Sequence, residues 1–406
     1  MTLLTIFILL LFLYSLGSKR LERTLITPPI LFTAAGMIVF SFVPVLPGHE
    51  SGLEIFLRVA EAGLVLLLFT DASRTDLRVL KNIRVLPARL LSVGMLLTLL
   101  LGAVAAMFVF RKLTIWEAGI LAAILAPTDA GLGQVIVNSR FVPMKVRQAL
   151  NVEAGLNDGL SVPFLLFFMA LTGKASEAQD VRLAGLIMEQ LGYGVVVGAV
   201  IGLIGGWLLG IARRREWMAG STVQLGVVVL PLLCGVASEA AAASMFIASF
   251  VAGLAVQGGF REAGKHSVEF AEDWGQFFNL SVFFLFGMLV AQAWHDFTPA
   301  HVLYAILSLT VVRMLPVAVS LLGTGLSRPT VIFMGWFGPR GLASIVLGLV
   351  YLEHGTRQPG EPTIRLAVMA TVLLSIFAHG MSALPGIKIY AAKISGLDAH
   401  TPERAG

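Results

Sequence analysis

Residues 126–129 read Ala-Pro-Thr-Asp, and residues 338–341 read Gly-Pro-Arg-Gly. Each tetrapeptide lies near the middle of an apolar stretch, 114–137 and 329–352, and each places a proline next to a charged side chain. Proline lacks a backbone N–H and displaces the carbonyl four residues earlier, so both stretches are predicted to be interrupted helices. Proline and glycine also simply kink membrane helices. Two such breaks in matching places nevertheless favour a transporter built from an inverted repeat.

The composition indicates that these stretches lie in lipid. Of 406 residues, 57% are hydrophobic and 13% are charged, whereas soluble domains carry about 25% charged residues. The mean hydropathy is +0.87. Thirteen apolar stretches are long enough to cross a bilayer, which takes roughly 17–25 residues. They are 2–17, 25–46, 53–72, 87–110, 114–137, 147–172, 183–211, 218–236, 240–257, 273–292, 300–323, 329–352 and 364–386. The sequence therefore predicts an all-α polytopic membrane protein of about 13 transmembrane helices.

Basic residues alternate between the two sides of these stretches. The loops after odd-numbered stretches hold 19 of the 29 Lys and Arg residues, among them Lys19, Arg74, Arg140, Arg213 and Lys388. The opposite loops hold Arg111, Lys112, Lys174, Arg182 and Arg357. Because positive residues gather on the cytoplasmic side, the N-terminus is expected outside and the C-terminus in the cytoplasm, in a cell (plasma) membrane.

Several other classes of protein are disfavoured. A single cysteine, Cys234, rules out an internal disulfide. A Walker loop and Cys/His metal-ligand spacings are both missing from the sequence, so neither ATP-driven pumping nor a bound cofactor is expected. The net charge of +5 follows the loops and does not indicate a nucleic-acid partner. The roughly twenty residues after Pro385 are too few for a fused soluble regulatory domain.

Charges inside apolar stretches mark functional candidates, because each costs about 2.5–3.5 kcal/mol at a helix centre. Five lie well inside: Asp129, Glu153, Asp158, Arg313 and Arg340. Asp129 follows Pro127 and Thr128, where an unwound turn would free carbonyl oxygens beside a carboxylate. Hard alkali cations bind such oxygen shells, whereas the alternative role of Asp129 is to cap the broken helix. Both roles can hold at once.

The sixth stretch reads N-V-E-A-G-L-N-D-G-L-S-V-P from Asn151 to Pro163. Glu153 and Asn157 are four apart and therefore share a helix face. Glu153 needs a cationic partner, which Arg313 or Arg340 can supply.

Asp158 is turned by about 100° from Asn157, onto a neighbouring face of the helix. It has no obvious permanent partner, and burial penalises its charged form. It is therefore predicted to carry a proton and, once deprotonated, to bind a cation. The alternative is a carboxylate held in a fixed ion pair. Asp71, near the end of the third stretch, is expected either to line a cytoplasmic funnel or to lie at a solvated helix end.

These motifs together resemble those of a known family. Thr128-Asp129, the run E-A-G-L-N-D-G at 153–159 and the run G-P-R-G-L-A-S at 338–344 are similar to those of the NhaP-type sodium/proton antiporters. That group is the Asn-Asp branch of the monovalent cation:proton antiporters. The resemblance covers essentially all thirteen stretches. The combination of motifs in this order is specific, although no single one of them is.

The resemblance implies an organisation of the chain. Residues 86–172 (stretches 4–6) and 298–388 (stretches 11–13) would form a core with stretches 5 and 12 unwound and crossing. Residues 1–85 and 218–297 would form an interface domain, with 173–217 as a linker and 389–406 as a short cytoplasmic tail. Members of the family are usually homodimers in the lipid membrane.

The resemblance also implies roles for particular residues. Asp158 would bind sodium or a proton, with Asp129 and Thr128 beside it. Glu153 would bridge to Arg313, and Asn157 would lie in the same polar cluster. Arg340 would neutralise the helix ends at the crossing, where Pro127 and Pro339 break the helices. Members with Asn before the key Asp are typically electroneutral, exchanging one cation per proton.

Two positions depart from the family pattern. Ala154 stands where many members have a serine hydroxyl, a cation ligand, which puts the choice among sodium, lithium and potassium in doubt. Ala130 stands where many have proline. The sequence therefore predicts sodium (or lithium)/proton exchange, with potassium/proton exchange on the same scaffold as the alternative. A passive cation channel and a transporter of organic anions fit the carboxylates at two broken helices less well.

Overall fold

The computed structural model describes residues 2–21, 24–42, 50–74, 85–172, 177–260, 267–354, 358–396 and 401–403. Within these residues the regular structure is helical. The helices are α1 (Thr2–Leu21), α2 (Pro28–Phe42), α3 (Glu50–Arg74), α5 (Val85–Arg89), η1 (Leu90–Gly94), α6 (Met95–Val109), α7 (Ile115–Ile124), α8 (Ala130–Val137), α9 (Met144–Thr172), α10 (Glu177–Arg214), α11 (Gly220–Ala240), α12 (Met245–Val256), α13 (Ser267–Gln292), η3 (Trp294–Asp296), α14 (Pro299–Leu309), α15 (Val311–Ser320), α16 (Arg328–Trp336), α17 (Leu342–His354) and α18 (Glu361–Ser395).

Among the described residues, each of the thirteen predicted stretches contains one helix or a group of consecutive helices. In the described part of the chain nine passes are single helices, and four combine shorter ones: α5–η1–α6, α7–α8, α14–α15 and α16–α17. In the parts of the chain that the structure describes, eight helical segments are long and apolar enough to cross a membrane, and four shorter apolar helices accompany them. Helices suit lipid because each satisfies its own backbone hydrogen bonds. The predicted all-α polytopic fold is confirmed.

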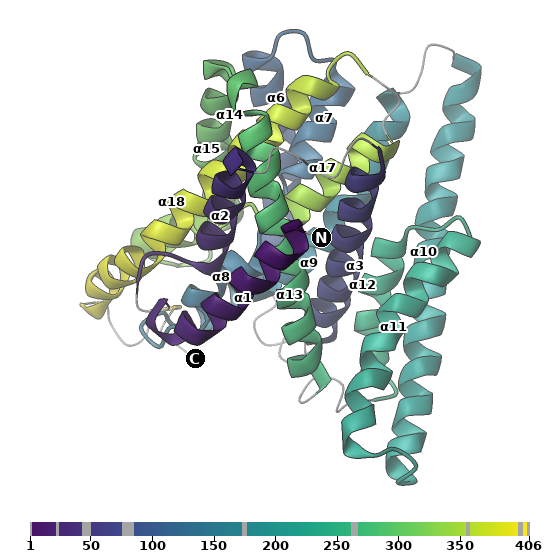
Figure 1. Ribbon diagram of the computed structural model, residues 1–406. Coiled ribbons are helices and arrows are strands. Elements are labelled where there is room, and N and C mark those ends of the chain that lie inside the picture. Colours follow the sequence, from purple (N-terminus) through teal and green to yellow (C-terminus); the bar gives the residue numbers. More distant parts are fainter. Residues whose placement is uncertain are drawn as a thin grey trace.

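Contacts between the helices define two groups, whose members are labelled in Figure 1. We call α2, α3 and α10–α13 the peripheral helices: α10 packs on α11 and α12, and α13 packs on α2 and α3. We call α5–α9 and α14–α18 the core helices: α6 packs on α7, α14 on α18, and α15 on α16. In Figure 1 the teal helices α10–α12 lie on one side of the molecule, and α14 and α15 lie on the opposite side.

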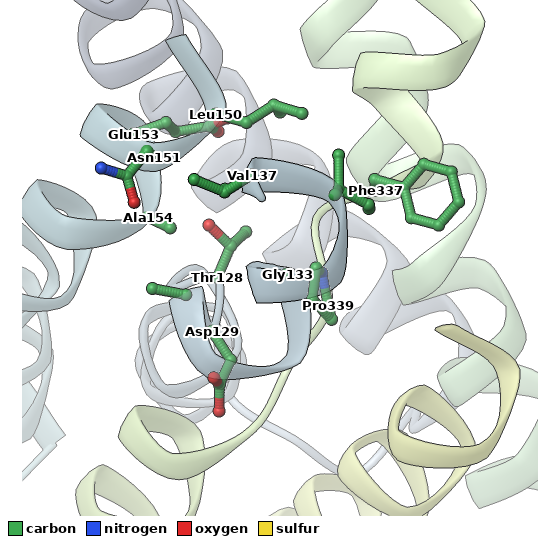
Figure 2. A pocket seen from close by; sticks show the side chains of 12 residues that line it. Thr128, Asp129, Gly133, Val137, Leu150, Asn151, Glu153, Ala154, Phe337 and Pro339 are labelled. Atoms are coloured by element: carbon green, nitrogen blue, oxygen red, sulfur yellow. The ribbon is translucent and has the colours of Figure 1, made fainter. Parts of the chain in front are cut away.

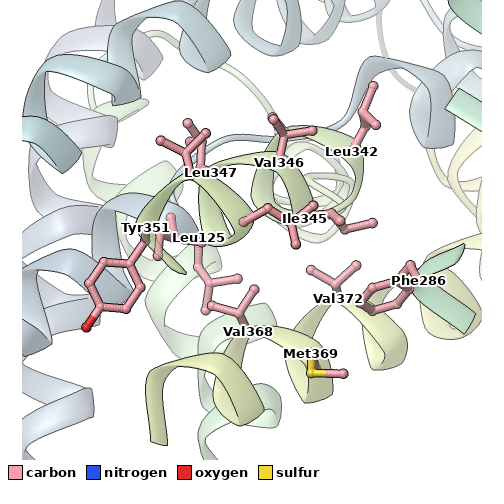
Figure 3. Close-up of a cluster of buried hydrophobic side chains, with 14 of the residues drawn as sticks. Leu125, Phe286, Leu342, Ile345, Val346, Leu347, Tyr351, Val368, Met369 and Val372 are labelled. Carbon is pink, nitrogen blue, oxygen red and sulfur yellow. The ribbon is translucent and has the colours of Figure 1, made fainter. Parts of the chain in front are cut away.

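Apolar side chains join α17 to α18 inside the core group (Figure 3). Leu347 and Tyr351 of α17 are 1% and 2% exposed, and Val372 of α18 is fully buried. Leu125, at the end of α7, belongs to the same buried cluster. This packing holds the second broken helix against the first, so it fixes the position of the two breaks.

The two broken helices meet at their interruptions. α7 ends at Ile124 and α8 begins at Ala130, while α16 ends at Trp336 and α17 begins at Leu342. The backbone N–H of Asp129 donates a 2.7 Å hydrogen bond to the carbonyl of Pro339, which links one break directly to the other. The interruptions predicted in stretches 5 and 12 are therefore confirmed.

The outer ends of these helices are capped by buried carboxylates from different sources. At the start of α7, Thr114 and Glu117 form a capping box, and Glu117 Oε1 also accepts from the N–H of Gly360 at 2.9 Å. At the start of α16, Glu403 Oε1 accepts from the N–H of Ser327 at 3.2 Å and from the Thr330 hydroxyl at 3.0 Å. The first carboxylate belongs to the helix that it caps, whereas the second comes from a segment 76 residues further along the chain.

Candidate cation-binding site

Asp129 is held by both broken helices. Its Oδ1 accepts from the N–H of Leu132 at 3.0 Å, which caps α8, and its Oδ2 accepts from the N–H of Leu342 at 2.7 Å, which caps α17. A Cβ on Gly341 would overlap Oδ2, so only glycine leaves room for the carboxylate there. The side chain is 6% exposed. One carboxylate thus neutralises the positive ends of two helices.

Arg340 binds the carbonyl groups at the carboxyl-terminal end of α7. It is fully buried, and its Nη1 donates to the carbonyls of Ala126 and Pro127 at 2.7 and 2.9 Å. These carbonyls follow the last turn of α7, where the helix dipole is negative. The backbone N–H of Arg340 donates to the Ser375 hydroxyl of α18 at 2.6 Å, which fixes the break against the last helix.

Glu153 and Arg313 form a buried ion pair with two parallel hydrogen bonds. Arg313 Nη1 lies 2.5 Å from Glu153 Oε1, and Nη2 lies 2.9 Å from Oε2. Glu153 is 3% exposed and Arg313 is 4% exposed. A Cβ on Gly338 would overlap the guanidinium, so the first glycine of the Gly-Pro-Arg-Gly motif makes room for Arg313. The predicted contact between Glu153 and an arginine is present, and the partner is Arg313.

Asn157 binds the break of the first broken helix. Its Nδ2 donates to Thr128 Oγ1 at 2.7 Å, and its Oδ1 accepts from the N–H of Thr128 at 3.3 Å. Sequence reasoning placed Asn157 and Glu153 on the same face of α9. They contact different elements, because α15 supplies Arg313 to Glu153 and the unwound segment lies one helical turn further along α9.

Asp158 is buried, and one of its carboxylate oxygens is left without a hydrogen bond. It is 4% exposed, and Oδ1 has no hydrogen-bond partner among the described residues. Asp71 of α3 lies against the same face of α9, because a Cβ on Gly155, three residues before Asp158, would be 3.2 Å from the Cβ of Asp71. A buried carboxylate with a free oxygen can take up either a proton or a cation.

A small cavity of about 20 Å³ opens beside the first break (Figure 2). That is room for about one water molecule. Its lining includes Thr128, Asp129, Glu153, Ala154 and Pro339, whereas Asp158 lies outside the lining. In Figure 2 the Thr128 side chain points toward Ala154, and the Asp129 carboxylate points the other way. The methyl group of Ala154 therefore lies where a serine would offer a hydroxyl.

The three residues predicted to bind the cation are thus in different states. Thr128 is hydrogen-bonded to Asn157, both oxygens of Asp129 accept backbone N–H groups, and Asp158 keeps an oxygen free. Among the described residues, no cluster of three or more His, Cys, Asp and Glu side chains is arranged to hold a metal ion. Any cation here would be bound by few carboxylates together with neutral oxygens.

Sequence reasoning missed two contributors. Ser375 accepts the N–H of Arg340, and Asn279 of α13 comes close to the first break. Asn279 could have been noticed as an amide near the start of the mostly apolar run 277–286, because a polar side chain is costly in a membrane helix and therefore indicates a function. Ser375 carries no comparable signal, because serine is common in membrane helices.

Comparison with known proteins places the chain within one family. The family model described as "Sodium/hydrogen exchanger, transmembrane" matches residues 6–387. A K(+)/H(+) antiporter of Alkalimonas amylolytica is 24% identical over 90% of this chain and 65% of its own length. Na(+)/H(+) antiporter 1 of Methanocaldococcus jannaschii is 26% identical over 95% of this chain and 96% of its own length.

The solved structure of a sodium proton antiporter from Methanocaldococcus jannaschii has the same fold. It superposes with a TM-score of 0.77 at 21% identity, and the match covers 98% of this chain and all of that one. Several curated relatives are longer than this chain, which spans only 20% to 65% of the length of three of them.

Proposed function

Because the chain belongs to the sodium/hydrogen exchanger transmembrane family, we propose that it exchanges a monovalent cation for protons across the membrane. The observation that carries this proposal is the free carboxylate oxygen of Asp158, which is buried on α9, the helix that packs against both broken helices. The other buried charges near the crossing are occupied in capping or in an ion pair. Asp158 is therefore the group best suited to exchange one ligand for another.

Competition for Asp158 is sufficient to couple the two ions. An empty charged carboxylate is costly to carry through the low-dielectric barrier, whereas either a proton or a cation neutralises it. The site therefore reorients only when loaded. The crossed breaks supply the rigid frame for alternating access around this position.

Neutral oxygens would complete the cation shell. We propose Thr128 as a ligand beside Asp158, with Asp129 stabilising the cation through its charge while it caps both helices. Glu153, Asn157, Arg313 and Arg340 hold the frame, and Asp71 lines the route from the cytoplasm.

The exchange is proposed to be electroneutral, one sodium or lithium ion per proton. One carboxylate that binds a single cation or a single proton has the same net charge in both loaded states. A potassium/proton antiporter is the second candidate, and the observation that favours it is Ala154 in the cavity wall, since the methyl group cannot coordinate a small cation.

We further propose the setting in which the protein works. It resides in the cell membrane as a homodimer, with the N-terminus outside and the C-terminus inside. Helices α1–α3 and α11–α13 form the interface domain, α10 is the linker, and the core helices of 86–172 and 298–388 move against the interface domain. A cysteine introduced at Arg215, which follows α10, should be labelled only from the cytoplasmic side.

Exchange in everted membrane vesicles tests this function. A preformed pH gradient, reported by fluorescence quenching, should collapse when sodium or lithium is added, with a rate that saturates. Potassium serves as the comparison, and a stronger response to potassium would select the second candidate. Proton flux that needs no counter-cation, or cation flux that never saturates, would indicate a channel and contradict antiport.

A further inference from the structure

Asn279 is a polar side chain on a peripheral helix that faces the first break of the core. It lies on α13, and its Oδ1 is buried without a hydrogen-bond partner in the described part of the chain. Leaving a buried amide oxygen unsatisfied is destabilising, because the hydrogen bonds that it made to water are not replaced. A leucine or phenylalanine at this position, like its neighbours Phe278 and Leu280, would avoid that cost. The amide at this position is therefore not explained by stability and points to a functional role.

Gly131 leaves a gap between Asn279 and Asp129. A Cβ on Gly131 would lie 3.1 Å from Asp129 Oδ1 and 3.3 Å from Asn279 Nδ2, so a single methyl group would touch both. Gly131 is itself exposed, whereas Asp129 is 6% exposed. The Asp129 carboxylate and the Asn279 amide therefore both border the space that a Cβ on this exposed glycine would fill.

An amide can present either of its ends to this gap. A half-turn about the last side-chain bond exchanges oxygen and nitrogen in the same volume. With the nitrogen turned inward, Asn279 offers an N–H to the negative charge of Asp129. With the oxygen turned inward, it offers a neutral oxygen of the kind that hard cations accept from amides and backbone carbonyls.

We propose that Asn279 is a further cation ligand, which contacts the transported ion in the gap beside Gly131 as it passes Asp129 toward Asp158. This inference rests on the proposed function, because it requires a cation to enter there. Asn279 belongs to the peripheral helices, and Asp129 and Asp158 belong to the core. The contact is therefore made in one orientation of the core and lost when the core moves, which makes Asn279 an entry ligand. It sets the cation affinity on one side of the membrane.

Two variants test the contact, each with a matched control. Asn279→Ala removes the amide, and Ser281→Ala on the same helix removes a hydroxyl that donates only to the carbonyl of Phe278 in its own turn. Gly131→Ala fills the gap, and Gly275→Ala adds a methyl on α13 where no atom of the described residues lies within 4 Å. All four proteins are compared at equal folded yield.

The measurement is the apparent KM for sodium, with lithium and potassium as further probes, and the maximal exchange rate in everted vesicles. Asn279→Ala and Gly131→Ala should each raise the apparent KM about tenfold, the effect of losing about 1.4 kcal/mol of binding, with the maximal rate nearly kept. Both controls should match the wild type.

Three outcomes would overturn the inference. An unchanged KM in Asn279→Ala would show that the amide does not touch the cation. A lower maximal rate with unchanged KM would show a role in the fold alone. A wild type without cation-dependent proton flux would overturn the proposed function itself, whereas an active wild type with an unaffected Asn279→Ala would overturn only this inference. If Asn279→Ala fails to fold, Gly131→Ala carries the same test without altering the amide.

Discussion

Glu153 and Asp158 lie less than two turns apart on α9, and they are 3% and 4% exposed. Glu153 uses both oxygens to bind Arg313, whereas Asp158 has an oxygen with no hydrogen bond in the described structure. The same helix therefore buries two carboxylates in different states: one is fully paired, and the other keeps an oxygen without a hydrogen bond. A fully paired carboxylate holds the frame, and a carboxylate with free bonding capacity can exchange its ligand. Burial alone does not separate these two roles; the bonding partners do.

The largest effect is expected from removing the charge of Asp158. Asp158→Asn keeps the shape of the side chain but neither titrates nor supplies a negative charge, so exchange should fall to background. Because no fixed partner is lost, the folded yield should stay near that of the wild type. Reconstituted liposomes with imposed sodium and pH gradients provide the measurement. Asp296→Asn, at an exposed position in η3, is the control and should exchange normally.

Removing either partner of the Glu153–Arg313 ion pair should lower the stability of the fold. Glu153→Ala and Arg313→Ala each leave an unpaired buried charge, which typically costs about 3–5 kcal/mol. Both variants should lose folded protein in thermal unfolding experiments monitored by size-exclusion chromatography. The double variant with the charges exchanged should recover part of the yield. Wild-type stability in both single variants would mean that the ion pair does not hold the frame.

A smaller effect is expected at the start of α16, where the capping carboxylate comes from Glu403. Burial is the largest influence on the pKa of Glu403 and raises it, but the hydrogen bonds from Ser327 and Thr330 outweigh burial and leave the pKa below its usual value of 4.5. A lowered pKa means that the charged form stabilises the fold. This contribution is complete above the usual value and is lost as the pH falls through the lowered pKa.

Glu403→Gln should therefore cost about 1 kcal/mol at neutral pH, as the loss of a helix cap does. The difference from the wild type should vanish in acid, where Glu403 is protonated in both folded and unfolded chains. Glu239→Gln, at an exposed position near the end of α11, serves as the control. A difference that persists unchanged at low pH would argue against a charged cap.

The sequence predicts those features that depend on neighbouring residues. Stretch lengths and the position of proline are local, so the thirteen passes and the two breaks could be placed without a structure. The sequence left two candidates for the partner of Glu153, Arg313 and Arg340, because a buried negative charge needs a positive charge nearby. The choice of Arg313 depends on how α15 packs, and the sequence does not reveal that packing.

Contacts between distant segments could not be predicted. Asp129 was expected to bind a cation or to cap one helix. It caps two helices, because the backbone N–H of Leu342 in the other broken helix donates to its Oδ2 at 2.7 Å. The pairing of Asn157 with Thr128 depends in the same way on where the unwound segment lies against α9. The capping of α16 by Glu403 could not be predicted from the sequence, because a carboxylate in a short polar tail normally faces water.

The central claim is that proton and cation compete for Asp158, and proton release on cation binding tests it most directly. Sodium is added to purified protein in weakly buffered solution with a pH indicator, at a pH where the site is protonated. The wild type should release about one proton for each cation bound, because a ligating carboxylate must first lose its proton. Asp158→Asn should release none, while Asp296→Asn releases as much as the wild type. Undiminished proton release from well-folded Asp158→Asn would place the competition at another group and contradict this account.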